Sequence, residues 1–206
     1  MMDFLFVLKA PIIGLIAAIP VGPVAIMAVQ KSISDGRKPG LSCGLGGTFV
    51  DTLCATIAVF AISSLGDFID RNSRVISLVG GLLVAILGVS MMFAKIKEHR
   101  GERRSRSYDP YNFLKAVGMG LGNPACPAVM LALFAGFRMD LSDQSPLIHV
   151  LAILGVSFGS ATYWYFLTKA VAYVGDRFNI NILLWINRIA GFAVAIFGII
   201  LLAKSF

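Results

Sequence analysis

The sequence predicts an all-α polytopic membrane protein with six transmembrane helices arranged as a three-plus-three inverted repeat. Of its 206 residues, 57% are hydrophobic and 14% are charged, whereas a soluble domain carries about 25% charged residues. The mean hydropathy is +0.82. Six apolar runs and two matched proline steps indicate the same class. We therefore expect one transmembrane domain, 1–206, with repeat 1 over about 1–95, a basic cytoplasmic loop over 95–112 and repeat 2 over about 113–206.

The apolar runs are long enough to cross a hydrocarbon layer of about 30 Å, which takes about 20 helical residues. Four of them hold no charged residue, while the second holds only Asp51 and the sixth only Arg188. The predicted spans are Ala10–Gln30, Leu41–Leu65, Val75–Ala94, Ala116–Phe137, Leu147–Thr168 and Ile182–Ala203.

Proline steps with Pro-x-x-Pro spacing, Pro20–Pro23 and Pro124–Pro127, interrupt the first and fourth spans 104 residues apart. Proline removes a backbone donor and clashes with the preceding turn, so each step predicts a broken helix. In lipid, freed backbone groups are tolerated only where protein buries them or they line a cavity. A matched pair of broken helices is typical of a transporter's binding site. The candidate substrate-binding or ion-binding residues are Pro20, Gly22, Pro23, Asp51, Asn123, Pro124 and Pro127.

Asp51 lies about 15 Å into the second span, at 1.5 Å per residue, and so lies near the membrane midplane. An ionisable side chain at this depth costs a few kcal/mol or more and indicates function by default. Small residues at Gly44, Gly47 and Thr48 allow a neighbouring helix to approach on the same face. Asp51 is therefore expected to face the bundle interior. Either it couples protons or positions a substrate, or it is a structural, hydrogen-bonded carboxyl group.

The two halves resemble each other beyond the prolines. Because each repeat holds three spans, an odd number, the second copy must be inverted in the membrane. At an offset of 110 residues, the third and sixth spans share Ile76/Ile186, Gly81/Gly191, Val84/Val194, Ala85/Ala195, Ile86/Ile196 and Gly88/Gly198. At an offset of 104, the first and fourth spans share Gly14/Gly118, Pro20/Pro124, Pro23/Pro127 and Ala28/Ala132.

Three further polar or aromatic residues have alternative interpretations. Asn123 precedes the second proline step, where its amide can satisfy freed backbone groups or touch a substrate. Trp164 falls late in the fifth span, which favours an interfacial aromatic belt over a substrate platform. Arg188 lies near the start of the sixth span, where snorkelling to the interface explains its charge.

The distribution of basic residues predicts the orientation in the cytoplasmic (inner) membrane, because cytoplasmic loops are enriched in Lys and Arg. Both termini are predicted outside. The net charge of +7 is then an orientation signal, and nucleic-acid binding is disfavoured. The run 95–106 is either a solvated loop or a contact for anionic lipid head groups. The outer side carries 5 basic residues, Lys9, Arg71, Arg74, Arg138 and Lys204. The inner side carries 12, Lys31, Arg37, Lys38, Lys95, Lys97, Arg100, Arg103, Arg104, Arg106, Lys115, Lys169 and Arg177.

Several functional classes lack support in the sequence. Cys43, Cys54 and Cys126 lie in apolar spans without CxxC spacing, so free packing thiols are expected. We expect no metal site, no cofactor and no catalytic residues, because no histidine or cysteine cluster and no nucleophile with a base can be assembled. No nucleotide-binding GxxxxGK[ST] loop occurs. A passive channel needs a continuous polar lining, and the isolated polar residues favour an occluding transporter.

Further motifs run in order through nearly the whole chain, namely Pro20–Pro23, Ser34–Gly40, Gly44–Gly46, Asp51, Asn123-Pro124 and Trp185–Gly191. Together with the six spans, their order resembles the LysE/RhtB family of amino-acid exporters. The resemblance implies efflux of amino acids or similar small metabolites across the cytoplasmic membrane, driven by an ion gradient such as that of protons. The single midplane acid favours neutral amino acids, and the oligomeric state, monomer or homo-oligomer, stays open. After Asn123-Pro124 the chain has Ala125, where the family's usual signature has lysine.

The basic-residue count gives a direct topology prediction. A reporter that is active only in the cytoplasm, fused after Phe206, should be silent because the C-terminus is predicted outside. The same reporter inserted in the 95–106 loop should be active. Strong activity of the fusion after Phe206 would overturn the orientation and reverse the direction assigned to each repeat.

Overall fold

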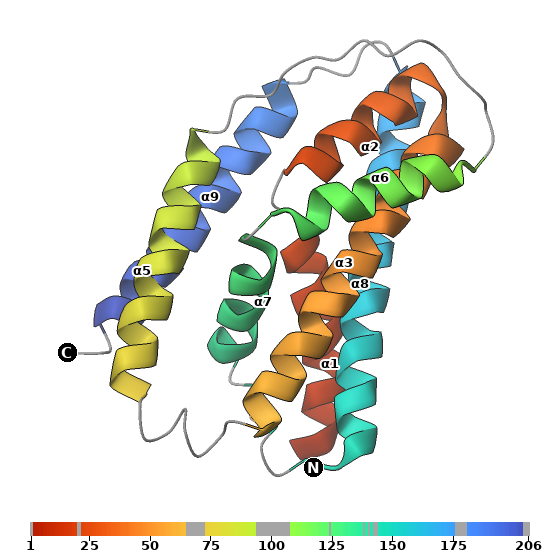
Figure 1. Ribbon diagram of the computed structural model, residues 1–206. Coiled ribbons are helices and arrows are strands. Elements are labelled where there is room, and N and C mark those ends of the chain that lie inside the picture. The colour runs from red at the N-terminus through yellow and green to blue at the C-terminus, as the bar shows by residue number, and fades with distance from the viewer. Residues whose placement is uncertain are drawn as a thin grey trace.

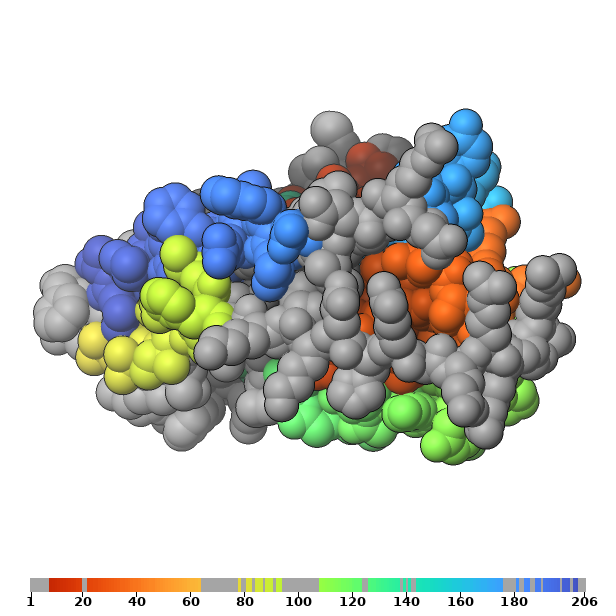
Figure 2. Space-filling view, turned by 90° about the horizontal axis from the view of Figure 1, so that it is seen from above, coloured from red at the N-terminus to blue at the C-terminus, as the bar shows by residue number. Residues whose placement is uncertain are grey.

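The computed structural model describes residues 2–19, 22–64, 73–93, 108–123, 125–137, 139, 141, 144–175 and 181–203, and it is all-α over these ranges (Figure 1). α1, α3, α7 and α8 form a bundle, and α5 and α9 stand together at its side (Figure 1). Seen from above, α2 and α6 lie on the bundle's side of the molecule, away from α5 and α9 (Figure 2). The helices are α1 (Met2–Ala18), α2 (Pro23–Ser34), α3 (Arg37–Ser64), α5 (Ser73–Met92), α6 (Pro110–Leu121), α7 (Ala125–Gly136), α8 (Pro146–Val174) and α9 (Asn181–Ala203).

Membrane-length helices occur where the apolar runs predict them. Within the described ranges, 2 helices, α3 and α8, are long and apolar enough to cross a membrane, or up to 4 spans if each bent helix pair counts as one. α5 and α9, of 20 and 23 residues, cover the ranges predicted for the third and sixth spans. The chain is therefore a polytopic membrane protein built from helices.

Both predicted helix breaks are present. α1 and α2 are bent by 77° across the first proline step, and α6 and α7 by 70° across the second. Gly22 precedes α2 in an extended conformation and Pro23 is the first residue of that helix. This position suits proline, because its missing N–H would have no partner there and its φ is already helical. Pro20 and Pro124 lie outside the described residues.

α3 and α8 pack closely along a face of small residues. A Cβ atom added at Gly44 would lie 2.7 Å from the side chain of Trp164, and one added at Gly47 would lie 3.0 Å from it. Trp164 is only 4% exposed. The predicted interfacial position of Trp164 is therefore wrong: the glycines of α3 leave room for the indole between the helices. The adjacent Tyr165 is exposed instead, and the guanidinium of Arg37 lies 4.2 Å from its ring centre.

α1 packs against α8 in the same close manner. A Cβ atom at Gly14 would overlap the backbone of Val156, and one at Gly159 would overlap the backbone of Pro11. At the start of the bundle, Lys9 Nζ donates a hydrogen bond of 3.1 Å to the carbonyl oxygen of Phe137, just after α7. α8 is thus held between α1 on one side and α3 on the other.

α5 and α9 make reciprocal contacts through their glycines. A Cβ atom at Gly88 would lie 2.6 Å from the carbonyl oxygen of Gly191, and one at Gly198 would lie 2.7 Å from that of Gly81. At the 110-residue offset, Gly81 corresponds to Gly191 and Gly88 corresponds to Gly198. In the structure each glycine meets the counterpart of the other one, so that Gly88 contacts Gly191 and Gly81 contacts Gly198. The two helices therefore run antiparallel and meet through equivalent surfaces.

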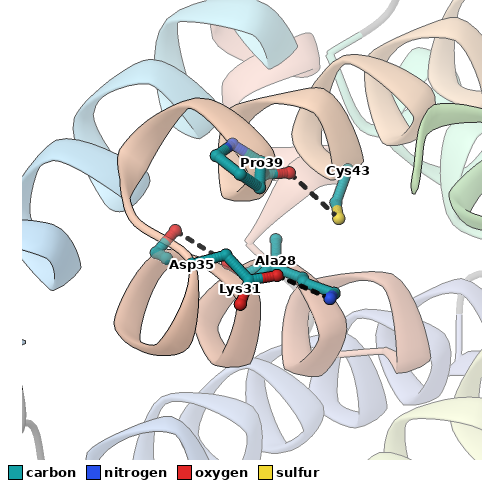
Figure 3. A network of polar contacts seen from close by, with 6 residues as sticks. Ala28, Lys31, Asp35, Pro39 and Cys43 are labelled. Carbon is teal, nitrogen blue, oxygen red and sulfur yellow. Dashed lines mark hydrogen bonds and ion pairs between the residues drawn. The ribbon is translucent and has the colours of Figure 1, made fainter. Parts of the chain in front are cut away.

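The turn between α2 and α3 is fixed by local polar contacts (Figure 3). Lys31 Nζ lies 2.7 Å from Asp35 Oδ2, one helical turn away, and the Asp35 side chain is 1% exposed (Figure 3). Gly36 follows with φ +99, a left-handed conformation that glycine adopts without a steric penalty. Cys43 Sγ bonds to the carbonyl oxygen of Pro39 at 3.4 Å (Figure 3). The turn folds α2 back onto α3.

The glycine contacts predict how substitutions change stability. Gly88→Ala should lower the melting temperature of the detergent-solubilised protein, because the new methyl group meets the α9 backbone and overpacking costs about 1–3 kcal/mol. Gly118→Ala is the matched control, since a Cβ atom there has nothing within 4 Å. Thermal unfolding followed by size-exclusion chromatography gives both values. Equal melting temperatures for the two variants would contradict the packing of α5 on α9.

Candidate functional site

The two helix breaks meet. A Cβ atom added at Gly22 would lie 3.6 Å from Nδ2 of Asn123, which is ordinary van der Waals contact. Gly22 ends the first break and Asn123 lies within the second, and both are half-buried. Segments a hundred residues apart in the sequence therefore lie against each other between the four half-helices.

Two helix N-termini start at this meeting point. α2 begins at Pro23, and the first turn of α7 contains Pro127. Pro23 is exposed and Pro127 is half-buried. The first N–H groups of a helix have no partner within it and carry partial positive charge. The breaks therefore place two ends that favour an anionic group near one another.

Asp51 joins α3 to α8. Its side chain is buried, with 7% of the residue exposed. Ser160 Oγ, on α8, donates a hydrogen bond of 2.6 Å to Asp51 Oδ2. Hydrogen bonds to charged groups are worth about 1.5–3 kcal/mol, and a buried carboxyl group without one is strongly disfavoured. Ser160 therefore supplies the partner that the burial of Asp51 requires.

The second carboxyl oxygen of Asp51 faces α7. Cys126 Sγ, in the first turn of that helix, lies 3.6 Å from Asp51 Oδ1 and donates to it. Cys126 follows Asn123 directly across the second break, and its N–H donates to the carbonyl oxygen of Asn123 at 3.2 Å. The buried carboxyl group is thus connected through one side chain to the place where the two breaks meet.

Ser160 also belongs to a short chain of hydroxyl groups. Its Oγ lies 3.3 Å from Thr48 Oγ1, and Thr48 Oγ1 lies 3.2 Å from the carbonyl oxygen of Gly44. A hydroxyl group can rotate and can both donate and accept. When Asp51 is ionised, Ser160 donates to it. When Asp51 is protonated, its O–H donates to Ser160, whose own hydrogen turns to Thr48, while Thr48 donates to the carbonyl. Asp51 and Ser160 therefore stay hydrogen-bonded to each other in both protonation states, and only the direction of that bond changes.

The family model of the LysE type translocator matches residues 15–205. The chain belongs to the LysE type translocator family. It is therefore a membrane transporter of small solutes, as the amino-acid exporters of this family are, and not an enzyme. No curated protein and no solved structure matches the chain.

In this LysE type translocator a second pair of hydroxyl groups also bridges α3 and α8. Thr52 Oγ1 lies 2.8 Å from Ser157 Oγ. Each of the two also reaches a carbonyl oxygen one turn back on its own helix, at 2.7 Å and 2.8 Å. This bridge lies one turn from the Thr48–Ser160 bridge on each helix. Together the two bridges fix the register of α3 against α8.

The sequence predicted part of this arrangement. Asp51, Gly22 and Asn123 lie in or beside the cluster, whereas Pro20 and Pro124 lie outside the described residues. Ser160 and Cys126 were missed as partners of the acid. The signal for Ser160 is the spacing of Ser157 and Ser160, which puts two small hydroxyl residues on one face of an otherwise apolar helix. In the described part of the translocator, no group of three His, Cys, Asp or Glu side chains could hold a metal ion.

Proposed function

We propose that this translocator is a secondary transporter that exports amino acids or related small metabolites across the cytoplasmic membrane in exchange for protons. The observation that carries the proposal is the contact of the two helix breaks, Gly22 beside Asn123, next to a buried carboxyl group. Transporters commonly bind solutes at such paired discontinuous helices near the midplane. The proposed binding residues are Pro20, Gly22, Pro23, Asp51, Asn123, Pro124 and Pro127.

The ends of the half-helices suit a zwitterion. α2 and α7 begin at the breaks, and their N-terminal N–H groups favour a carboxylate. α1 and α6 end there, and C-terminal carbonyl oxygens favour an ammonium group. The amide of Asn123 adds a donor and an acceptor. These groups recognise both charges of the amino-acid backbone, and the protein needs no second charged side chain to do so. The proposed solutes are therefore neutral amino acids.

Asp51 is the proposed proton carrier. The hydroxyl chain through Ser160 and Thr48 accommodates the ionised and the protonated carboxyl group. Protonation removes a charge beside the first turn of α7 and changes what Cys126 and Ser160 bond to. A proton entering from outside thereby favours one arrangement of the break, and its release to the cytoplasm favours the other. This coupling drives export by a proton gradient.

The alternating-access architecture that we propose is the three-plus-three inverted repeat. The reciprocal contacts of Gly88 with Gly191 and of Gly198 with Gly81 support it, because a two-fold axis across antiparallel helices produces such an exchange. The two bent pairs, 104 residues apart, support it as well. Figure 1 places the start of α1 and the end of α9 toward the same end of the molecule, which is compatible with both termini outside.

Asp51→Asn tests the proton-carrying role. Asparagine keeps the shape and accepts the hydrogen bond from Ser160, but it does not exchange a proton. In proteoliposomes screened with a panel of labelled amino acids, we expect export driven by a pH gradient to fall at least about tenfold, the equivalent of 1.4 kcal/mol. Solute–solute exchange, which moves no net proton, should persist.

Thr162→Ala is the matched control, since Thr162 Oγ1 bonds only within α8, to the carbonyl oxygen of Phe158. It should retain gradient-driven export. Wild-type rates and wild-type pH dependence in Asp51→Asn would reduce Asp51 to a structural residue. Transport of no amino acid by the wild-type protein would contradict the proposed solute class.

A further inference from the structure

Two thiols touch beside the acid. Cys54 Sγ on α3 lies 3.1 Å from Cys126 Sγ on α7, and both cysteines are free. A disulfide bond has an S–S length of about 2.05 Å, so an approach of about 1 Å closes the pair. The two residues are 72 positions apart in the sequence, so a bond between their sulfur atoms would join α3 to α7. The pair therefore has the separation of a dithiol that is ready to oxidise.

The surroundings of the pair define which reagent can reach it and which group can take its proton. The thiolate is the nucleophile in disulfide formation. Asp51 Oδ1 lies 3.6 Å from Cys126 Sγ and is placed to accept its proton. Cys54 is buried and Cys126 half-buried, so a small uncharged oxidant is the reagent that fits the site. Cys43 is buried apart from them and bonds to the carbonyl oxygen of Pro39.

We propose that Cys54 and Cys126 form a reversible disulfide bond that locks the translocator when the cell meets a peroxide. The Cys126 thiolate attacks one oxygen of hydrogen peroxide, and that oxygen stays on the sulfur as a sulfenic acid. The O–O bond breaks, and the other oxygen leaves as hydroxide and takes up the thiol proton to give water. Cys54 then attacks the sulfenic sulfur and expels a second water. Two thiols lose two electrons, the peroxide gains them, and a small thiol reverses the step by exchange.

The disulfide bond would stop transport because of the place where it lies. This conclusion rests on the proposed function. Cys126 is in the first turn of α7, directly after the break at Asn123. Cys54 is one turn from Asp51 on α3. A covalent bond between them fixes the half-helix to α3 at the point that must rearrange when the solute and the proton exchange. The disulfide holds one arrangement and stops the cycle.

The bond is tested without any transport measurement. Trypsin cleavage after Arg37, Arg71, Lys115 and Arg138 places Cys54 and Cys126 in separate peptides, but Cys43 shares the peptide of Cys54. The reconstituted Cys43→Ser protein is therefore treated with hydrogen peroxide, alkylated, denatured and digested. Mass spectrometry should find the two peptides linked, and reduction should separate them. Cys54→Ser should give no linked peptide.

The lock is tested in the same vesicles. Peroxide should reduce export at least tenfold in the wild-type and Cys43→Ser proteins, dithiothreitol should restore it, and Cys54→Ser should be insensitive to peroxide. Absence of the linked peptide would overturn the disulfide, and a linked peptide with unchanged export would overturn the lock. A reduced protein that transports nothing would contradict the proposed function alone, because the linked peptide is read independently of transport.

Discussion

The hydrogen bond from Ser160 to Asp51 is the contact on which the arrangement of the bundle depends. Hydrocarbon supplies no partner for a carboxyl group, so Asp51 must be satisfied by protein. Ser160 on α8 and Cys126 on α7 provide the partners, at 2.6 Å and 3.6 Å. The requirement brings α8 and α7 against α3, and the glycine face of α3 allows α8 to come close enough. One buried acid thereby sets the position of three helices.

The same acid is connected to the discontinuities of the fold. Cys126 belongs to the first turn of α7, and Asn123 just before it lies against Gly22 of the other break. A change in the partner of Asp51 therefore reaches both breaks through neighbouring residues, from Cys126 to Asn123 by a backbone hydrogen bond and from Asn123 to the adjacent Gly22. In the proposed transporter, protonation changes the hydrogen bonds of the Asp51 carboxyl group, and the half-helix α7, which shares one of those bonds, moves in response.

The sequence predicts the helices and their breaks because hydrophobic length and proline act locally. It predicts the burial of Asp51 because a charge at midplane depth has few alternatives. It does not identify Ser160, because serine in a membrane helix commonly bonds to its own backbone, as Ser157 also does here. It also misplaces Trp164, because distance along a span does not tell which face a side chain occupies. The contact of Gly22 with Asn123 depends on the tertiary fold and leaves no local pattern.

The most direct test of the account is difference infrared spectroscopy of the reconstituted protein, recorded with and without its transported amino acid. If solute binding and protonation compete through Asp51, the carboxyl C=O stretching band should change when the solute is added. The band should shift in Ser160→Ala, which removes its hydrogen-bond partner, and disappear in Asp51→Asn. A spectrum without a carboxyl change, or one whose carboxyl change persists in Asp51→Asn, would contradict the central role of this acid.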